Sequence, residues 1–484
     1  MEIYIAIDLG TTGCRSILFD ENLKIHGESY EEYSLITPKE NWVEQDARLW
    51  WEMTLRTIKN AILNSKIDAN QIKGISVSSQ GITIVPADCN LTPLCNALSW
   101  LDTRATSEAL RIKKDFGEVT MFNLTGKPVE ATYTLPKLLW IKENMPEIFE
   151  KTWKFLMPMD FLIAKLTGKS VTDHSMASGT LMYDLKENIW SDKVLEAYDI
   201  PKDKLPLILE SGKSIGTIKD DIATELGIPN TCIVSVGAQD QKCAALGAGL
   251  KDGVMTVSLG TAGAVTKLWH DINTESNNKV GWCGYISPKT WVTEGVINTA
   301  GTCLRWVRDL MFSCEGYDVI NTEAENAQEN KSSLLFYPYL SGPSSPDFYP
   351  DSVGTFYGIK LATKRGDFAL AVMEGIAFQI RILLETMNAY ENIDNLILFG
   401  GGAKSSLWCQ IIADVTGMKI SVTTTAEAAG AGAAILASMG CGKAIQSLEC
   451  EKSYYPSQNQ AYYEEKYKKY REIEKKLWQK EVSL

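Results

Sequence analysis

The sequence contains only three histidines, His26, His174 and His270, in 484 residues. So few histidines leave little material for a histidine-based metal site or for a serine-type catalytic triad. The eleven cysteines include no CxxC pair. That pattern favours free thiols in a reducing compartment over a framework of disulfides.

The chain also lacks an uncharged apolar run of the length that spans a membrane. The nearest approach, residues 428–442, is short and rich in Ala and Gly, so a buried helix explains it better. The first residues lead directly into an expected strand, with no pattern of a secretory signal. We therefore expect a cytoplasmic protein without a membrane partner.

Basic residues are in the minority, and the formal net charge is −12. An acidic balance of this size argues against broad nucleic-acid binding, so we expect no nucleic-acid partner. It does not exclude a small anionic ligand, which needs only a local positive potential. The length of the chain predicts two large domains or more, because a single core rarely grows to this size.

Residues 3–20 predict a strand, a tight hairpin and a second strand. The acid Asp8 stands at the end of the first strand, and small and hydroxyl-bearing residues follow it: Gly10, Thr11, Thr12 and Gly13. Such a turn can present N–H groups and hydroxyls to an anion, while the acid holds a metal ion. Alone this indication is weak, because many hairpins with Thr and Gly are only turns.

A related hairpin recurs at residues 256–268. Gly260, Thr261 and Gly263 repeat the spacing of the first turn, and Ser258 stands where the first copy has Asp8. Two related strand–turn–strand units so far apart predict two domains of similar fold, each opening with its own phosphate loop. The repeat strengthens the phosphate interpretation of both turns.

Residues 231–241 read as a buried strand that ends in Asp240 and Gln241, with a helix of small residues after it. Open α/β sheets bind ligands at the carboxyl ends of their strands, which makes Asp240 a candidate functional residue. The alternative is that Asp240 only caps the helix that follows.

Three further places bring together residues of functional type. In residues 97–104, Trp100, Asp102 and Arg104 would face one side of an extended segment, although a surface ion pair beside a packed Trp is the alternative. Gln80 ends an expected strand over residues 75–81. After the strand 395–399 come Gly400, Gly401, Gly402 and Ala403, where a flat ligand could lie against bare backbone.

Together, from Ile3 to about Gly442, these motifs resemble the FGGY family of carbohydrate kinases, most nearly its xylulokinase-type members. The resemblance implies an α/β fold of two actin/hexokinase-like (ribonuclease H-like) ATPase domains with an active-site cleft between them. We expect an N-terminal domain over 1–245 with the sugar side and the first phosphate loop. A C-terminal domain over 246–450 would hold the second loop and the adenosine site, and a solvated helical tail would cover 451–484.

The resemblance also implies roles for individual residues. Asp240 would be the catalytic base, and Asp8 would hold Mg²⁺ through water. The substrate would contact Gln80, Asp102, Arg104, Asp240 and Gln241. ATP would be bound at Gly10, Thr11, Thr12, Gly13, Gly260, Thr261, Gly263, Gly400, Gly401, Gly402 and Ala403.

The implied reaction is ATP-dependent phosphorylation of a hydroxyl on a small sugar or polyol, with a ketopentose such as xylulose favoured. Gln80 is followed at once by Gly81 and Ile82, so the histidine run of xylulose kinases and the Gln-Arg-Glu of glycerol kinases are both missing. Glycerol, erythritol, ribulose and gluconate therefore stay open as substrates. An actin- or heat-shock-type ATPase and a sugar-sensing module are the alternatives of another class. The sequence says little of the oligomeric state, and a homodimer is one option.

Overall fold

The computed structural model describes residues 1–275, 279–342 and 344–479. These form two compact units, each assembled from separate stretches of chain. Unit 1 comprises Met1–Gly247, Trp269–Val292 and Glu427–Leu448, and unit 2 comprises Ala248–Leu268, Thr293–Ala426 and Glu449–Leu484. The sequence predicts boundaries after residues 245 and 450, whereas the units of the structure are interleaved along the chain.

Unit 1 is built on a mixed sheet with the strand order β13-β14-β5-β1-β2-β3. Its strands are β1 (Ile3–Leu9), β2 (Gly13–Asp20), β3 (Ile25–Glu32), β5 (Ile72–Ser79), β13 (Ser214–Thr217) and β14 (Ile233–Ser235), and β15 (Ala238–Gln239) also pairs with β5. The hairpin of β1 and β2 is antiparallel, and β5 runs parallel to β1. The ends of β1 and β5 therefore lie at the same edge of the sheet.

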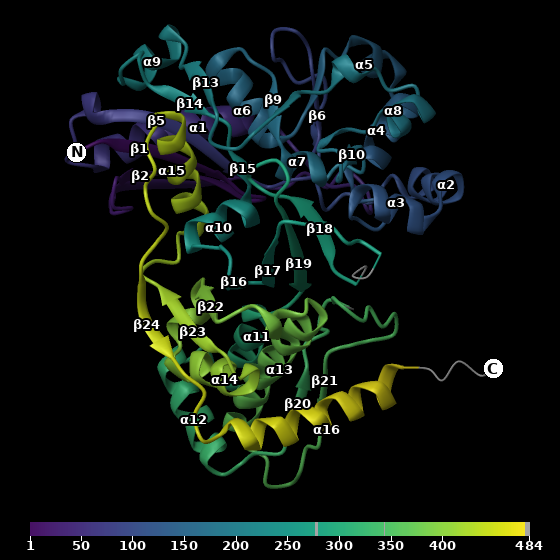
Figure 1. Ribbon diagram of the computed structural model, residues 1–484, viewed down its shortest axis with the longest axis vertical. Helices are drawn as coiled ribbons and strands as arrows, with labels where there is room; N and C mark the ends of the chain where they lie inside the picture. The colour runs from purple at the N-terminus through teal and green to yellow at the C-terminus, as the bar shows by residue number, and fades with distance from the viewer. Residues whose placement is uncertain (276–278, 343, 480–484) are drawn as a thin grey trace. The chain divides into compact units, whose positions relative to one another are not determined.

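Helices cover both faces of this sheet. The helix α1 (Ala47–Asn64) packs on β2 and β3, and it buries Trp50 and Ile58. The helix α15 (Ala428–Gly440) comes late in the chain but packs on β1 and β5, as its yellow ribbon beside the purple strands shows in Figure 1. Gly430 permits this approach, because a Cβ there would lie 2.8 Å from Ile17.

The rest of unit 1 is largely helical, and part of it surrounds a second apolar cluster that contains Leu138, Tyr183 and Trp190. Its helices are α2 (Thr106–Phe116), α3 (Glu118–Thr125), α4 (Thr134–Asn144), α5 (Pro146–Lys151), α6 (Pro158–Thr167), α7 (His174–Ser178), α8 (Asp192–Ala197), α9 (Asp220–Leu226) and α10 (Asp240–Ala248). Short strands join them: β4 (Glu44–Gln45), β6 (Val85–Ala87), β7 (Ala97–Leu98), β8 (Lys154–Leu156), β9 (Val171–Asp173), β10 (Tyr183–Asp184), β11 (Ile189–Trp190), β12 (Leu207–Leu209) and β18 (Gly281–Gly284).

Unit 2 repeats the central arrangement, with the strand order β19-β17-β16-β22-β23-β24. The strands are β16 (Val254–Leu259), β17 (Gly263–Trp269), β19 (Trp291–Ile297), β22 (Asn395–Phe399), β23 (Lys419–Thr423) and β24 (Cys450–Tyr454). As in unit 1, the first strand forms an antiparallel hairpin with the second and runs parallel to a later strand, here β22. The repeat in the sequence is thus a repeat in topology.

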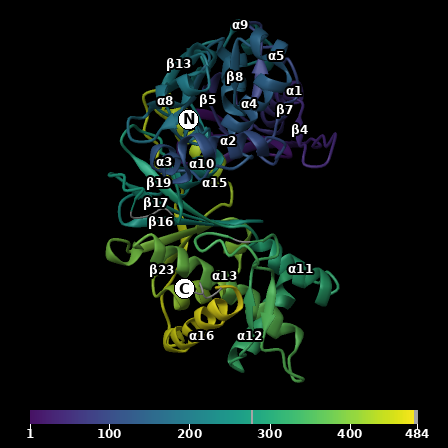
Figure 2. The same cartoon turned by 90° about the vertical axis from the view of Figure 1, so that its right-hand side faces the viewer.

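The helices of unit 2 are α11 (Gly301–Met311), α12 (Tyr317–Glu329), α13 (Arg365–Thr386), α14 (Ser406–Thr416) and α16 (Gln460–Trp478). The strands β20 (Leu335–Tyr337) and β21 (Thr355–Tyr357) pair antiparallel in a separate two-stranded sheet. The prediction that the terminal helix is solvated is wrong. Tyr463, Tyr467 and Tyr470 of α16 are buried, and the Lys466 ammonium pairs with the buried Glu374 of α13 at 2.5 Å. Figure 2 shows α16 lying against α13 in the turned view.

Within residues 1–275, 279–342 and 344–479, no helix combines the length and the apolar character needed to cross a membrane.

Candidate active site

The first predicted phosphate loop is a tight turn between β1 and β2, closed by a hydrogen bond from the Gly10 N–H to the Gly13 carbonyl at 2.9 Å. Residues outside the turn hold Thr11. The indole Nε1 of Trp100 donates to the Thr11 hydroxyl at 2.9 Å, and the Gln45 amide donates to the Thr11 carbonyl at 2.6 Å. The tip of the turn is therefore fixed before any ligand binds.

Asp8 lies at the end of β1, where Ser78 of β5 donates its hydroxyl to the carboxylate at 2.9 Å. Burial raises the pKa of Asp8 to about 6. Arg15 opposes that rise, but its guanidinium is paired with Glu427 at 2.6 Å. A carboxylate whose negative charge is so poorly compensated is a suitable partner for a cation.

The donor set limits which metal could bind there. Among the residues that the structure describes, no cluster of three or more His, Cys, Asp or Glu side chains could hold a metal ion by itself. Mg²⁺ commonly binds through one or two carboxylates together with substrate phosphates and water. Asp8 fits that mode of binding.

The second hairpin differs from the first by one residue in register. The Gly260 N–H bonds to the Ala262 carbonyl at 3.1 Å, so this turn is centred on Thr261 alone. The start of α11 lies against it: the Gly301 N–H donates to the Gly260 carbonyl at 2.8 Å, and the Thr302 hydroxyl donates to the Thr261 carbonyl at 3.0 Å. The two turns are related but not identical.

A cavity of about 650 Å³ opens beside this second turn in unit 2. Of the predicted nucleotide residues of unit 2, Gly260, Thr261, Gly401 and Gly402 line it, whereas Gly263, Gly400 and Ala403 do not. A Cβ added at Gly401 would meet nothing within 4 Å, so this backbone faces open space. Gly400 serves the backbone conformation instead, because its φ of 94° lies in the left-handed region that glycine favours.

Further residues of the cavity were not predicted from the sequence. They are Leu259, Gly301, Leu304, Arg305, Tyr317, Asp318, Asn321, Lys404, Ser405 and Trp408. The residues of α11 and α12 carry no motif and reach the cavity only through the packing of these helices. Lys404 and Ser405 directly follow the glycine run, and this position is the one feature of the sequence that could have indicated their place in the cavity.

Asp240 follows β15 and opens α10. Its Oδ1 accepts hydrogen bonds from the Gln241 N–H at 2.7 Å and from the side-chain amide of Gln239. The Gln239 N–H in turn donates to the Ser175 hydroxyl at 2.9 Å. These contacts include the first turn of the helix, as the capping alternative expects, and they also fix the orientation of the carboxylate.

Gly237 allows the strand that precedes Asp240 to reach this place. A Cβ at Gly237 would lie 1.8 Å from the Val77 carbonyl of β5, a distance that no real side chain adopts. The bare backbone lets β15 pair with the end of β5, with Gln239 opposite Ser79. Asp240 therefore sits at the carboxyl edge of the parallel strands.

Gln80, the residue after β5, is buried and hydrogen-bonded on both sides of its amide. Its Nε2 donates to Gln45 Oε1 at 2.9 Å, and the Thr83 hydroxyl donates to its Oε1 at 3.4 Å. Since Gln45 also bonds to Thr11, a chain of hydrogen bonds links Gln80 to the first turn.

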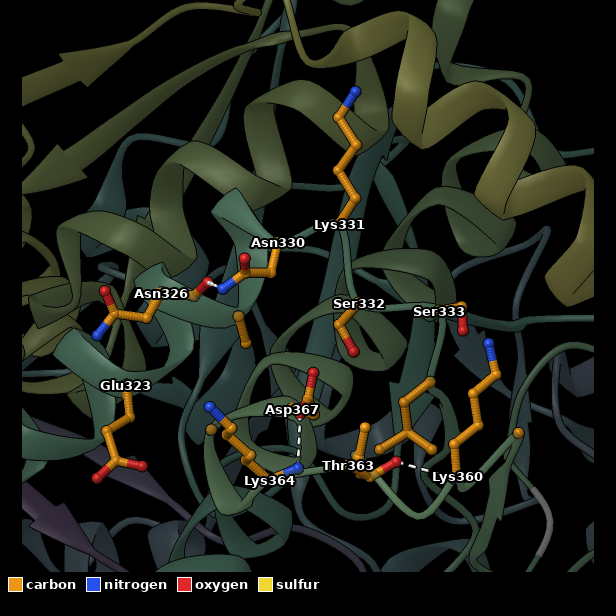
Figure 3. A pocket seen from close by; sticks show the side chains of 15 residues that line it. Glu323, Asn326, Asn330, Lys331, Ser332, Ser333, Lys360, Thr363, Lys364 and Asp367 are labelled. Atoms are coloured by element: carbon orange, nitrogen blue, oxygen red, sulfur yellow. Dashed lines mark hydrogen bonds between the residues drawn. The ribbon is translucent and has the colours of Figure 1, made fainter.

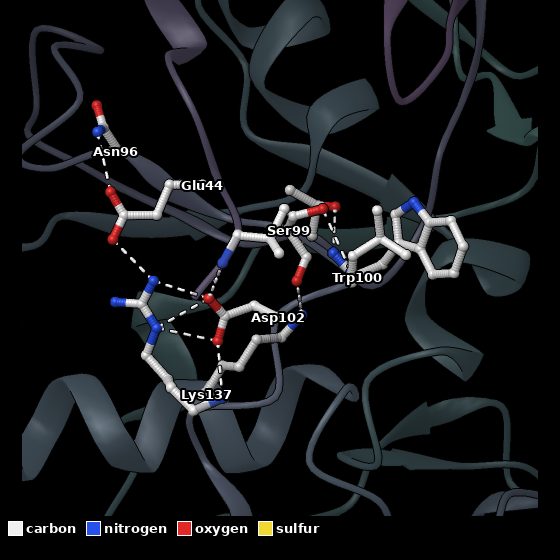
Figure 4. A network of polar contacts seen from close by, with 10 residues as sticks. Glu44, Asn96, Ser99, Trp100, Asp102 and Lys137 are labelled. Atoms are coloured by element: carbon white, nitrogen blue, oxygen red, sulfur yellow. Dashed lines mark hydrogen bonds and ion pairs between the residues drawn. The ribbon is translucent and has the colours of Figure 1, made fainter. Parts of the chain in front are cut away.

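Asp102 and Arg104 form a buried ion pair, drawn in part in Figure 4. The side chains are 0% and 2% exposed, whereas that of Trp100 is 39% exposed. The prediction that all three face one side is wrong, because the chain turns here and the Asp102 N–H bonds to the Ser99 carbonyl at 3.0 Å. The alternative of a surface ion pair is also wrong.

The partners of this pair are all protein groups. Arg104 Nη2 lies 2.7 Å from Asp102 Oδ2 and 2.7 Å from Glu44 Oε1, and the Val43 N–H donates to Asp102 at 2.6 Å. Both side chains are buried among these partners, so almost none of their surface is open to a substrate. The arrangement suits a brace between residues 42–45 and 99–104 better than a binding surface.

Lys137 of α4, another part of the network in Figure 4, was not predicted as a special residue. It is fully buried, and its ammonium donates to the carbonyls of Ile82 at 3.1 Å and Ser99 at 2.9 Å. Burial lowers its pKa to about 7. In the sequence Lys137 stands among apolar residues at the start of a helix, and nothing in that pattern indicates a buried lysine that bonds to two carbonyls.

Two units with the same hairpin and parallel-strand arrangement define a protein of the actin/hexokinase-like ATPase fold. The models of the N-terminal and C-terminal domains of the FGGY family of carbohydrate kinases match residues 3–247 and 256–441. The chain therefore belongs to the FGGY family. It is an ATP-dependent carbohydrate kinase, and its substrate is a small sugar or a related small molecule.

Individual relatives cover nearly the whole chain. The xylulose kinase of Bacillus subtilis is 31% identical over 456 residues, which are 94% of this chain and 91% of that protein. A crystal structure of a xyloylose kinase from Brucella ovis has a TM-score of 0.90 at 28% identity, covering 98% of this chain and 99% of the other. A gluconate kinase structure from Lactobacillus acidophilus also has a TM-score of 0.90, at 26% identity and 98% of both chains.

Proposed function

We propose that this kinase transfers the γ-phosphoryl group of ATP to a hydroxyl of a ketopentose, with xylulose as the favoured substrate. The observation that carries the proposal is the placement of Asp240 at the carboxyl edge of β5 and β15, with its carboxylate held by Gln239 and Gln241. The relatives named xylulose kinase support the choice of sugar.

Asp240 would act as the base. An alcohol is a far weaker acid than a carboxylic acid, so Asp240 cannot deprotonate it in advance. It would accept the proton late, while the new bond from the sugar oxygen to phosphorus forms and the bond to the oxygen of ADP breaks. Phosphoryl transfer of this kind depends mainly on orientation and on neutralising charge, and a fixed carboxylate provides the orientation.

The two glycine turns would hold the phosphates through their N–H groups and hydroxyls, and the cavity beside Gly401 and Gly402 would take the adenosine. When bound, Mg²⁺ would neutralise charge on the phosphates, and Asp8 would hold it through water. Gly263, Gly400 and Ala403 would then shape the backbone around the nucleotide instead of lining the cavity.

On the sugar side we assign Gln241 to substrate binding and a supporting role to Gln80, Asp102 and Arg104, whose side chains are buried among protein partners. The buried pair braces the segments that carry Gln45 and Trp100, which both bond to Thr11. Loss of the pair would thus affect the phosphate turn as well as the sugar side.

The test is release of ADP by the full chain with a panel of xylulose, ribulose, gluconate, glycerol and erythritol. We expect xylulose to give the highest kcat/KM and Asp240→Ala to abolish turnover while binding of ATP survives. The matched control is Asp221→Ala, an exposed acid on α9 that should leave turnover unchanged. Near-normal turnover by Asp240→Ala would overturn the assignment of the base.

Gluconate is the second candidate substrate, because a gluconokinase of Bacillus subtilis is 28% identical over 453 residues. Highest kcat/KM with gluconate would replace xylulose as the substrate and leave the role of Asp240 unchanged.

A further inference from the structure

Unit 2 contains a second cavity, of about 770 Å³, that none of the predicted residues lines. It lies between the second half of α12, the loop before β20, the loop after β21 and the first turn of α13. Figure 3 shows its polar walls, with Lys360 and Lys364 on either side of Thr363 and Lys331 at the rim. Its volume is typical of sites for small molecules.

The walls of this cavity are locally positive, although the chain as a whole is acidic. Lys331, Lys360 and Lys364 line it, and within the described part of the chain none of the three takes part in an ion pair. Of the two acids of the wall, Glu323 pairs with Arg365, whereas Asp367 keeps its negative charge because its partner is a backbone amide. Glu323 accepts a hydrogen bond from Arg365 Nε at 2.8 Å, and Asp367 accepts one from the Lys364 N–H at 2.7 Å.

The remaining groups of the wall suit a hydroxylated molecule. Ser332 and Ser333 offer hydroxyls, and Asn326 offers an amide. The Asn330 amide already donates to the Asn326 carbonyl at 2.7 Å and the Thr363 hydroxyl accepts from the Lys360 N–H at 2.8 Å, but each keeps further hydrogen-bonding capacity. Such walls disfavour an apolar ligand, which would leave these polar groups without partners. Lysine ammonium groups bind phosphate as point charges, and hydroxyl and amide groups bind sugar hydroxyls.

We propose that this cavity is a second ligand site, which binds a phosphorylated sugar and is distinct from the nucleotide cavity. Lys360 and Lys364 would bind the phosphate, and Asn326, Asn330 and Ser332 would bind the hydroxyls. The two cavities share α12: Tyr317, Asp318 and Asn321 line the nucleotide cavity, and Glu323 and Asn326 line the second one.

Because one helix forms a wall of both cavities, a ligand in the second site should change the affinity for nucleotide. This consequence rests on the proposed nucleotide site. Linkage requires the effect to be reciprocal, so the nucleotide must change the affinity for the sugar phosphate by the same factor.

The test is calorimetry on the full chain with glucose 6-phosphate, fructose 1,6-bisphosphate and ribose 5-phosphate, and with glucose as the uncharged comparison. We expect at least one of the phosphates to bind, glucose not to bind, and the affinity to fall as salt rises. Lys360→Ala with Lys364→Ala should weaken binding at least tenfold. The matched control is Lys452→Ala with Lys469→Ala, two exposed lysines of unit 2 outside both cavities.

Repeating the titration with a saturating non-hydrolysable ATP analogue separates the two sites. Retained binding, with an affinity changed by the factor that the sugar phosphate imposes on the analogue, supports the proposal. Competition between the two ligands, equal binding by the double variant, or binding of none of the three phosphates would overturn it. None of these readouts needs turnover, so failure of the proposed substrate is recognised separately, in the ADP assay.

Discussion

The guanidinium carbon of Arg104 lies 3.8 Å from the centre of the Trp42 ring, while its nitrogens bind Asp102 and Glu44. One buried side chain thus joins the segment before α1 to the turn that follows β7. Each of these segments sends one hydrogen bond to Thr11, from Gln45 and from Trp100. The first turn is held in place through this brace.

Arg104→Met should destabilise the protein strongly. The variant leaves Asp102 buried without its ionic partner, and breaking a buried pair in this way costs about 3–5 kcal/mol. Urea unfolding followed by tryptophan fluorescence measures the change. The control is Arg56→Met, which removes an exposed partner of Glu31 and should alter stability little. Equal effects of the two substitutions would contradict the brace.

Lys137 should make stability rise with pH above neutrality. Burial lowers its folded-state pKa to about 7 from an ordinary value of 10.5. Between these pH values the unfolded chain holds the proton and the folded chain does not. The free energy of unfolding therefore increases with pH, by up to about 1.4 kcal/mol per pH unit.

Urea unfolding at pH 7, 8 and 9 measures that slope in the parent protein and in Lys137→Met. The variant should be less stable at every pH, because the carbonyls of Ile82 and Ser99 lose a donor, and its slope should be smaller. Lys24→Met, at an exposed position, should keep the parent slope. Parallel curves for the parent and Lys137→Met would show that the lysine is charged in both states.

Gly401→Ala should separate binding of ATP from folding. A Cβ at Gly401 meets open space in the structure, so stability should stay within about 0.5 kcal/mol of the parent. If adenosine lies on this backbone, the new methyl group crowds it, and the KM for ATP should rise about tenfold, since overpacking costs roughly 1–3 kcal/mol.

The neighbouring substitution Gly400→Ala is the comparison. Its φ of 94° and a Cβ 3.0 Å from the Leu259 carbonyl make that change a defect of folding. Thermal unfolding and initial rates over a range of ATP concentrations distinguish the two variants. An unchanged KM in Gly401→Ala would remove this glycine from the nucleotide site.

Trp100→Phe should weaken binding of ATP while the fold persists. The substitution removes the Nε1–H that donates to the Thr11 hydroxyl, and a neutral hydrogen bond contributes about 0.5–1.5 kcal/mol. We expect the KM for ATP to rise about two- to tenfold with a smaller change in kcat. Trp153→Phe, a similarly exposed tryptophan of the same unit, should change neither constant.

Local patterns predicted the parts of the fold that are local in origin. The two hairpins and the buried strand before Asp240 follow from alternation, glycines and turn residues within about fifteen positions, and the family and fold class follow from their order. The segment from Trp100 to Arg104 was mispredicted because its conformation depends on Trp42 and Glu44, which are distant in sequence. Arg305 and Asn321 could not be predicted for the same reason, because they reach the nucleotide cavity only through contacts between segments that are distant in sequence.

The terminal helix was mispredicted for another reason. Its charged composition suggested a solvated face, but Tyr463, Tyr467 and Tyr470 recur at the spacing of one helical face. The spacing of these tyrosines, taken as the stronger signal than the charged composition, predicts a packed helix.

The helix α15 has a consequence for the order in which the protein can form. It covers the face of the first sheet at β1 and β5, yet it is synthesised some 350 residues after β5. During translation that face of the sheet lacks its covering helix until residues 428–440 have been synthesised. Unit 1 as the structure shows it is therefore complete only after α15 has been synthesised.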